Sequence, residues 1–285
     1  MTRFIYLSDT HWGVAAPGHT MQQAQPYKLP ELLVALEEWI AKHRPVDFVL
    51  HGGDMIDSTS EENIDCVAQT FQLSVPVYLC LGNHDLTSPD AVEMWLDRTP
   101  NFFIGGPNFT LETSDCLLHV VPNQWGPVPY YWNGVQEPHF STEQERFLFD
   151  GLGRDPHLVH ILSTHSPFYG VPVDQTGLNQ LFHHPPQAFV DRGQSLLKTH
   201  SNLLLILGAH SHINTCVEQD GGHLVTSSSF VEVPFDFKFV NISDGHITMT
   251  THCLVDHIDE AASYDFGKTF VQGRVCDRTI EHYTL

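Results

Sequence analysis

The sequence has few basic residues. It contains 13 Lys and Arg against 34 Asp and Glu in 285 residues, a formal net charge of -21 at pH 7 with His neutral. A field of that sign repels phosphate backbones, so general nucleic-acid binding is not expected unless bound cations reverse the field locally. The six cysteines stand singly, without a Cys-x-x-Cys pair, and this spacing predicts no disulfide framework.

Long hydrophobic runs are also missing. Nowhere do 18 apolar residues follow one another, and the first apolar run, residues 4–7, is far shorter than the hydrophobic core of a signal peptide. We therefore expect a soluble, cytoplasmic protein with no membrane partner. The sequence has no internal repeat, low-complexity tract or linker, which favours a single domain.

Histidine, by contrast, is abundant. The chain has 20 His, and imidazole is the commonest metal-binding side chain in proteins. Short apolar runs predict buried strands at residues 4–7, 46–50, 75–81, 158–163 and 203–207. Each run leads into a motif of potential ligands: Asp9-Thr10-His11, Gly53-Asp54-Met55-Ile56-Asp57, Gly82-Asn83-His84-Asp85, Thr164-His165 and His210-Ser211-His212. One such motif is weak evidence, but the chance assembly of five in this arrangement is improbable.

The remaining pattern indicates an α/β fold. Apolar residues at helical spacing predict a helix from residue 29 to about 40, Ser60 can cap a helix over 61–73, and Ser141 with Gln144 resembles a capping box for a helix near 142–152. From about residue 223 to 252, short strands joined by turns indicate antiparallel sheet.

Together the motifs resemble the signature of the calcineurin-like metallophosphoesterases, D-x-H, G-D-x-x-D, G-N-H-D/E, a lone His and G-H-x-H, over residues 9–212. One departure is Ala209, which stands where the family usually has Gly. The resemblance implies a four-layer α/β sandwich, with two mixed sheets packed face to face and helices outside. We expect a catalytic domain over residues 1–252 and a C-terminal extension, 253–285, of unassigned structure that packs on the same domain.

The resemblance also implies a set of site residues. One metal site would consist of Asp9, His11 and His212, and a second of Asn83, His165 and His210, with Asp54 bridging both. His84 would be catalytic, as a general acid or charge stabiliser. We interpret Asp85 as the carboxylate that orients the His84 imidazole, and Asp57 as a supporting or helix-capping residue rather than a ligand.

Mixed imidazole and carboxylate sites suit transition-metal ions such as Mn, Fe or Zn, divalent or mixed-valence. Two such ions about 3.5 to 4 Å apart can clamp the attacking and leaving oxygens of a displacement at phosphorus, and they lower the pKa of a bound water, so that hydroxide attacks without a Ser or Cys intermediate. The sequence therefore predicts a two-metal hydrolase of phosphoesters.

The length and layout are most similar to the class III cyclic-nucleotide phosphodiesterases, which favours a small phosphodiester, such as a cyclic nucleotide, as substrate. A phosphomonoesterase or a nuclease on the same metal centre is the alternative. A non-catalytic scaffold is disfavoured because all seven ligand positions are present. The sequence leaves homo-oligomerisation open.

Several other residues have competing interpretations. His183 and His184 could replace His165 as the lone-His ligand, but the segment before them does not have the pattern of a buried strand. His51 is interpreted as a packing residue at a strand end, and the strand-borne imidazoles are interpreted as structural: His119, His160 and His252. We expect three loops to form the pocket wall, by stacking or packing: Trp125 to Trp132, residues 166–176 with Phe168 and Tyr169, and residues 14–28.

Overall fold

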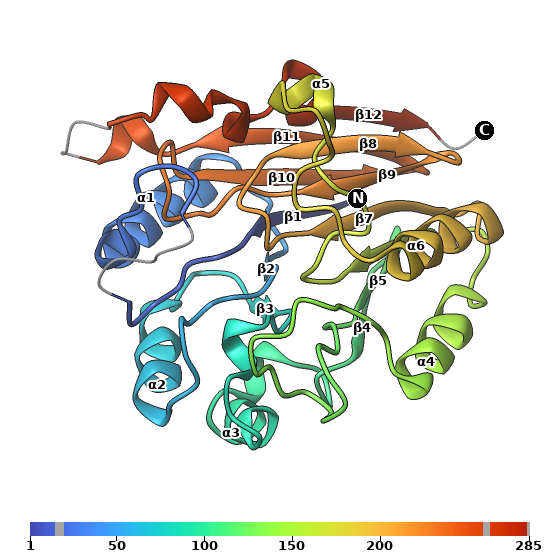
Figure 1. Ribbon diagram of the computed structural model, residues 1–285, viewed down its shortest axis with the longest axis horizontal. Helices are drawn as coiled ribbons and strands as arrows, with labels where there is room; N and C mark the ends of the chain where they lie inside the picture. The colour runs from blue at the N-terminus through green and yellow to red at the C-terminus, as the bar shows by residue number, and fades with distance from the viewer. Residues whose placement is uncertain (15–19, 259–262, 284–285) are drawn as a thin grey trace.

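Two six-stranded sheets form the centre of the protein (Figure 1). The computed structural model describes residues 1–14, 20–258 and 263–283. The first sheet has the strand order β12-β11-β10-β1-β2-β3. Its strands are β1 (Thr2–Leu7), β2 (Phe48–His51), β3 (Val77–Leu79), β10 (Asp236–Ser243), β11 (His246–Cys253) and β12 (Thr279–Tyr283). β1, β2 and β3 are parallel neighbours, and β10 to β12 add antiparallel pairs.

The second sheet has the order β4-β5-β6-β7-β9-β8. Its strands are β4 (Phe109–Glu112), β5 (Cys116–Val120), β6 (Val159–Ser163), β7 (Leu203–Gly208), β8 (Thr215–Gln219) and β9 (Gly222–Thr226). The four inner strands β5, β6, β7 and β9 are parallel, and the edge strands β4 and β8 are antiparallel to their neighbours. Both sheets are therefore mixed, as the sequence predicted.

The helices lie around the two sheets. They are α1 (Leu29–Lys42), α2 (Glu61–Thr70), α3 (Ala91–Arg98), α4 (Thr142–Leu152), α5 (Val173–Thr176), α6 (Gln187–Thr199) and α7 (Val275–Arg278). Trp39 of α1 packs on the first sheet, with its ring 5.0 Å from Phe237 and 5.2 Å from Phe239. Leu148 of α4 and Phe189 of α6 share a core with Leu162 of the second sheet. The predicted four-layer sandwich is confirmed (Figure 1).

The space between the sheets is filled by one large apolar core. It joins Phe4 and Leu50 of the first sheet to Leu118, Ile161 and Leu205 of the second. The run Phe4 to Leu7 is fully buried, as expected of a strand covered on both faces. This core fixes the two sheets against each other, and so fixes the loops at their strand ends.

The C-terminal residues continue the first sheet, because β12 pairs with β11. Arg278 of α7 donates to both carboxylate oxygens of Asp236 on β10, at 2.9 and 3.1 Å. None of the helices in the described part of the chain combines the length and the apolarity that crossing a membrane requires.

Candidate metal centre

The loops that follow β1, β2, β3, β6 and β7 bring the predicted ligands together. Asp9, His11 and His212 form one group whose potential ligand atoms all lie within 4.8 Å of one another, and Asp54, His165 and His210 form a second such group. Because the carboxyl ends of parallel strands meet at one edge of a sheet, motifs far apart in sequence converge here.

Asp54 lies between the two groups. Its Oδ2 is 3.2 Å from His165 Nε2 and 3.8 Å from His11 Nε2. The amide oxygen of Asn83 is 3.0 Å from His210 Nδ1. All seven predicted ligands are therefore close enough for two ions that share one carboxylate.

Two polar atoms test whether this donor set suits a metal. Asp9 Oδ2 is buried without a hydrogen-bond partner among the described residues, and the buried His165 Nε2 has the Asp54 carboxylate 3.2 Å away. Buried polar atoms in folded proteins are almost always paired, and leaving one unpaired costs about 1 to 3 kcal/mol. A bound cation would supply the partner that Asp9 Oδ2 lacks, and imidazole and carboxylate together are a donor set that transition metals accept, so the residues fit the metals that the sequence predicts.

The backbone is strained at the same positions. Five of the seven predicted ligands have a positive φ although none is glycine: Asp9 (56°), His11 (43°), Asp54 (54°), His210 (63°) and His212 (56°). Such strain clusters at functional sites. Nearby, a side chain at Gly53 would collide with the His165 imidazole, and one at Gly82 with the Asp54 carboxylate, so both loops need glycine to approach this closely.

The carboxylates and imidazoles shift one another's pKa values. Burial alone would raise the pKa of Asp9, but the neighbouring His212 outweighs it and holds that pKa below its usual range. Burial disfavours a charged His165, yet Asp54 outweighs it and raises the His165 pKa to about 9. Burial lowers the pKa of His210 to about 3. Metal ligation by His165 must therefore displace a proton, which couples metal binding to pH.

Contacts to the Nδ1 atoms, which point away from the two ligand groups, orient several of the imidazole rings. His165 Nδ1 donates to the backbone oxygen of Gly52 at 2.9 Å, and His212 Nδ1 donates to Glu232 Oε1 at 2.6 Å. Asp57 Oδ1 lies 3.4 Å from His11 Nδ1, and Asp57, His11 and His84 form a further group whose potential ligand atoms lie within 4.8 Å of one another. These contacts turn Nε2 of each ring toward the ligand group, as in other metal sites that use histidine.

Glu232 was not singled out from the sequence. A signal for it exists, because it is the one acid within the apolar stretch Phe230 to Pro234, and Glu is rarely buried unless it is paired. In the structure its side chain is 2% exposed.

Comparison with known proteins identifies the family. The family model for calcineurin-like phosphoesterases matches residues 2–214. The chain belongs to this family. No curated protein matches it in sequence.

Solved structures share the family fold at low sequence identity. GAP50, the anchor in the inner membrane complex of Plasmodium, has a TM-score of 0.62 at 12% identity, over 92% of this chain and 88% of that one. A 5'-nucleotidase precursor from Thermus thermophilus has a TM-score of 0.51 at 12% identity, over 94% of this chain and 56% of that one. The sulfate thiohydrolase SoxB from the same organism has a TM-score of 0.55 at 12% identity, over 94% of this chain and 59% of that one. At these identities the likeness shows the fold alone.

In this family member, His84 lies beside the metal ligands. Its Nδ1 donates to the backbone oxygen of Asp57 at 2.7 Å, and its ring is 4.7 Å from that of His11. Since a carbonyl oxygen only accepts, this bond places a proton on Nδ1.

The contacts of Asp85 differ from the expectation that it orients His84. Its two carboxylate oxygens accept from the backbone N–H groups of Gly82 (2.9 Å) and Ile56 (3.1 Å). Asp85 therefore ties the loop after β3 to the loop after β2, and the His84 ring contacts Asp57 instead.

Ala209, the departure from the family pattern, is fully buried and its N–H donates to the backbone oxygen of His165 at 2.8 Å. The methyl group is thus accommodated without separating the loops after β6 and β7.

The imidazoles interpreted as structural are not members of the ligand groups, although His51 lies close behind them and pairs with Thr10 Oγ1 at 3.1 Å. His51 Nδ1 accepts from the Gly53 N–H, and His119 Nε2 is paired with His160 Nδ1 at 3.1 Å. The His252 ring is stacked on Phe237.

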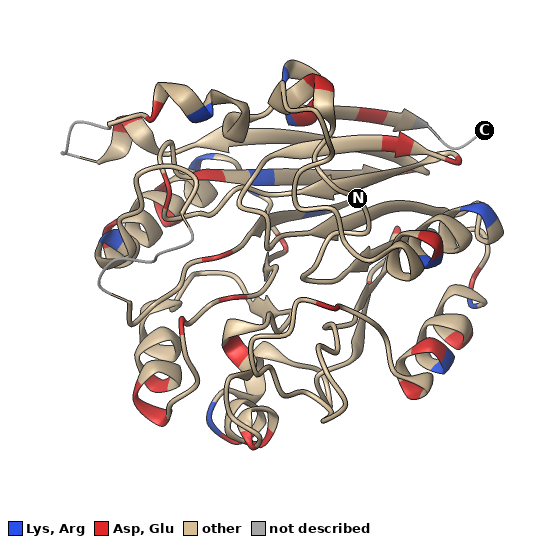
Figure 2. Cartoon of the chain, in the orientation of Figure 1, with Lys and Arg blue, Asp and Glu red and all other residues tan. Residues whose placement is uncertain are grey.

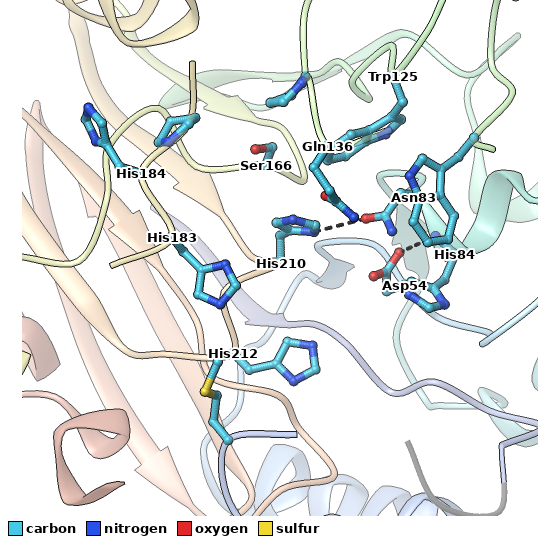
Figure 3. A pocket seen from close by; sticks show the side chains of 14 residues that line it. Asp54, Asn83, His84, Trp125, Gln136, Ser166, His183, His184, His210 and His212 are labelled. Carbon is cyan, nitrogen blue, oxygen red and sulfur yellow. Dashed lines mark hydrogen bonds between the residues drawn. The ribbon is translucent and has the colours of Figure 1, made fainter. Parts of the chain in front are cut away.

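A cavity of about 500 Å³ opens over the ligands (Figure 3). Its walls include Met21, Trp125, Trp132, Ser166 and His183, so each of the three predicted loops contributes to it. The Trp125 ring is 5.2 Å from the ring of His210, and the Trp132 ring is 4.9 Å from that of His84.

The aromatic residues of the loop after β6 behave differently from the tryptophans. Phe168 is buried and stacks on Phe189 with ring centroids 4.3 Å apart, so it packs α6 against the second sheet. Tyr169 packs beside the same core and, like Phe168, is not among the residues that line the cavity.

His183 is placed in the cavity, not among the ligands. His165 occupies the ligand group, whereas the ring of His183 lies 6.4 Å from that of His210. In Figure 3, His183 and His84 stand on opposite sides of the pocket, with His210 and Asp54 between them.

Proposed function

We propose that the chain is a metal-dependent hydrolase of small phosphodiesters. The observation that carries this proposal is the pair of ligand groups with Asp54 between them, which lie at the floor of a cavity of about 500 Å³. Cavities of this size hold small molecules. Two bound ions would supply a water of lowered pKa and would neutralise charge on the phosphoryl oxygens.

The protein side chains have separate tasks in this proposal. Asp54 holds the spacing of the two groups, and Asp57 fixes the tautomer of His84 by accepting from its Nδ1. Proton exchange with the substrate then falls to His84 Nε2: as the imidazolium, protonated on both nitrogens, His84 would give the Nε2 proton to the leaving oxygen and remain neutral with its proton on Nδ1. His183, on the opposite wall, would hydrogen-bond a second substrate oxygen.

The cavity lining favours a diester over a monoester. Among the described residues, no Lys or Arg lines it, and two tryptophans do. A phosphate monoester carries close to two negative charges at pH 7, whereas a diester carries one. With no cationic side chain to match the second charge, the singly charged ester with an apolar or planar substituent is the better fit. The resemblance to cyclic-nucleotide phosphodiesterases points the same way.

Charge also argues against a nuclease for long duplexes. The net charge is -21, and Figure 2 shows few basic positions, which are scattered along the chain among more numerous acidic ones. Beyond about 8 Å, ions bound at the centre are screened at physiological salt, so a polyanion would meet mainly the acidic surface.

A matched pair of substrates tests the proposal. The protein would be loaded with Mn²⁺, Fe²⁺, Zn²⁺ or Co²⁺ and assayed on p-nitrophenyl phosphate and bis(p-nitrophenyl) phosphate, then on cyclic nucleotides. We expect a higher kcat/KM on the diester, and loss of turnover in Asp54→Ala and after chelation.

Three results would count against this proposal. A consistently higher kcat/KM on the monoester would replace the diesterase with a phosphomonoesterase. Preferential cleavage of long nucleic acid would favour the nuclease. Two bound ions without turnover of any ester would favour a metal-binding scaffold.

A further inference from the structure

Glu232 joins one metal ligand to the pocket wall. Its side chain is almost completely buried. Oε1 accepts from His212 Nδ1 at 2.6 Å, while Oε2 accepts from the backbone N–H groups of Met21 (3.0 Å) and Gln22 (2.6 Å). Met21 is one of the residues that line the cavity. A single carboxylate therefore serves three donors from two distant segments.

These contacts fix which nitrogen of His212 faces the other ligands. Because Oε1 accepts the proton on Nδ1, the neutral form of the ring has its lone pair on Nε2. Nε2 lies 3.2 Å from His11 Nε2 and 3.5 Å from Asp9 Oδ1, within the first ligand group. A lone pair on Nε2 is the form that a metal requires.

Backbone and side-chain contacts next to Glu232 extend this connection along the chain. Residues 24 and 232 form an antiparallel bridge, and Gln25 N–H donates to the backbone oxygen of Val231. The side chain of Gln22 then donates to the backbone oxygens of Asp265 and Lys268 in the C-terminal segment. Glu232 thus stands at the junction of the His212 loop, the pocket wall and the C-terminal segment.

We propose that Glu232 is a positioning residue for the first metal site, which holds His212 in its Nδ1–H tautomer while it anchors the pocket wall at Met21. This inference rests on the proposed two-metal function. The inference predicts that Glu and Gln at position 232 behave differently although they have nearly the same shape. Glu offers two acceptor oxygens, whereas Gln offers one oxygen and one NH₂ group, which donates.

In the variant Glu232→Gln, the side chain can no longer accept hydrogen bonds both from His212 Nδ1 and from the backbone N–H groups of Met21 and Gln22. The backbone N–H groups of Met21 and Gln22 can only donate, so the amide oxygen turns to them. The NH₂ group then faces His212 Nδ1, which must accept. That moves the proton of the neutral ring to Nε2 and blocks the lone pair that would bind the ion. If Glu232 served only packing and the two backbone donors, Gln would be harmless.

The experiment is a Mn²⁺ titration of the full chain, followed by calorimetry and by electron paramagnetic resonance. We expect wild type to bind two ions, and Glu232→Gln to weaken one of them about 10- to 100-fold while the other is unchanged. Asn83→Ala, which should weaken the other ion, identifies the affected site. Glu218→Gln, an exposed acid on β8, is the matched control and should bind as wild type does.

A second measurement needs no variant. In Zn²⁺-loaded wild-type protein, imidazole ¹H–¹⁵N spectra should show His212 protonated at Nδ1. Protonation at Nε2 would overturn the inference, as would a Gln variant that binds both ions normally or weakens both equally. Wild type that binds no ion would overturn both this inference and the proposed function. Two bound ions with no ester hydrolysis would sink the proposed function alone.

Discussion

Replacing His84 by Ala separates proton transfer from metal binding. The side chain is 18% exposed, so its removal opens a space that water can fill instead of a dry cavity. Its Nδ1 donates a hydrogen bond to the backbone oxygen of Asp57. Losing a bond of this kind costs about 1 kcal/mol of stability. The fold and the seven predicted metal ligands should therefore survive the substitution.

The effect on turnover should be much larger than the effect on stability. A positioned proton donor contributes about 10²- to 10⁴-fold to kcat, and each factor of ten is about 1.4 kcal/mol of activation free energy. His84→Ala should thus raise the barrier by about 3 to 5 kcal/mol. The loss should depend on the leaving group, because an alkoxide must be protonated as it departs whereas p-nitrophenolate needs little help.

The assay compares wild type and His84→Ala on an alkyl aryl series of phosphodiesters, with bound metal measured in the same samples. We expect the variant to lose at least about 10-fold more kcat on the poorest leaving group than on p-nitrophenolate. His157→Ala, at an exposed histidine before β6, is the control and should behave as wild type. Equal losses across the series would assign His84 to charge stabilisation. No loss with both ions present would remove it from the mechanism.

Three further predictions follow from other contacts. Asp54→Ala should lose both bound ions, and Asn83→Ala mainly one, as measured by elemental analysis. Asp85→Ala should lower the free energy of unfolding by about 2 to 6 kcal/mol, because two buried N–H groups lose their acceptor; unchanged stability in urea with lost activity would restore the orienting role. Burial lowers the pKa of Lys238 to about 8. Between pH 8 and the usual lysine pKa, Lys238 is therefore protonated in the unfolded chain but largely neutral in the folded one, so the free energy of unfolding rises with pH. From pH 7 to 10.5, wild type should gain about 3 kcal/mol relative to Lys238→Met, as measured by denaturant titration at each pH.

The sequence predicted the elements that carry strong local signals. Ser141 caps α4 through a complete capping box, and the helix spans Thr142–Leu152 as expected. Ser60 caps α2, but this helix ends at Thr70, three residues before the predicted end. The edge strands β4 and β8 were missed, since they have half-exposed positions and depend on a neighbouring strand for their pattern. His119 was placed in a strand without bounds for it, and in β5 its imidazole is paired with Thr110 Oγ1 at 3.0 Å and with His160 Nδ1 at 3.1 Å.

In the site, too, residues with a local sequence signal were predicted and residues that depend on distant contacts were not. The motifs named all the residues that form the two ligand groups, because each motif is local in sequence. The residues that orient the ligands were harder to find. Asp85 is adjacent to His84 in sequence but bonds elsewhere, while Glu232 is 20 residues from His212 and directly contacts it. Adjacency along the chain is a poor guide to such contacts, since they depend on how separate loops pack.

Backbone conformation gives a second route to the site that does not depend on motif matching. A non-glycine residue with positive φ costs about 1 to 3 kcal/mol, somewhat less for Asp than for branched side chains. Five such residues among the predicted ligands would together cost about as much as the whole stability of a typical domain, about 5 to 15 kcal/mol. Glycine at each position would remove that cost, so folding alone gives no reason for Asp and His there. Side chains retained against the local preference of the backbone point to a task that only those side chains can perform, and at this site the task that we propose is to bind metal ions.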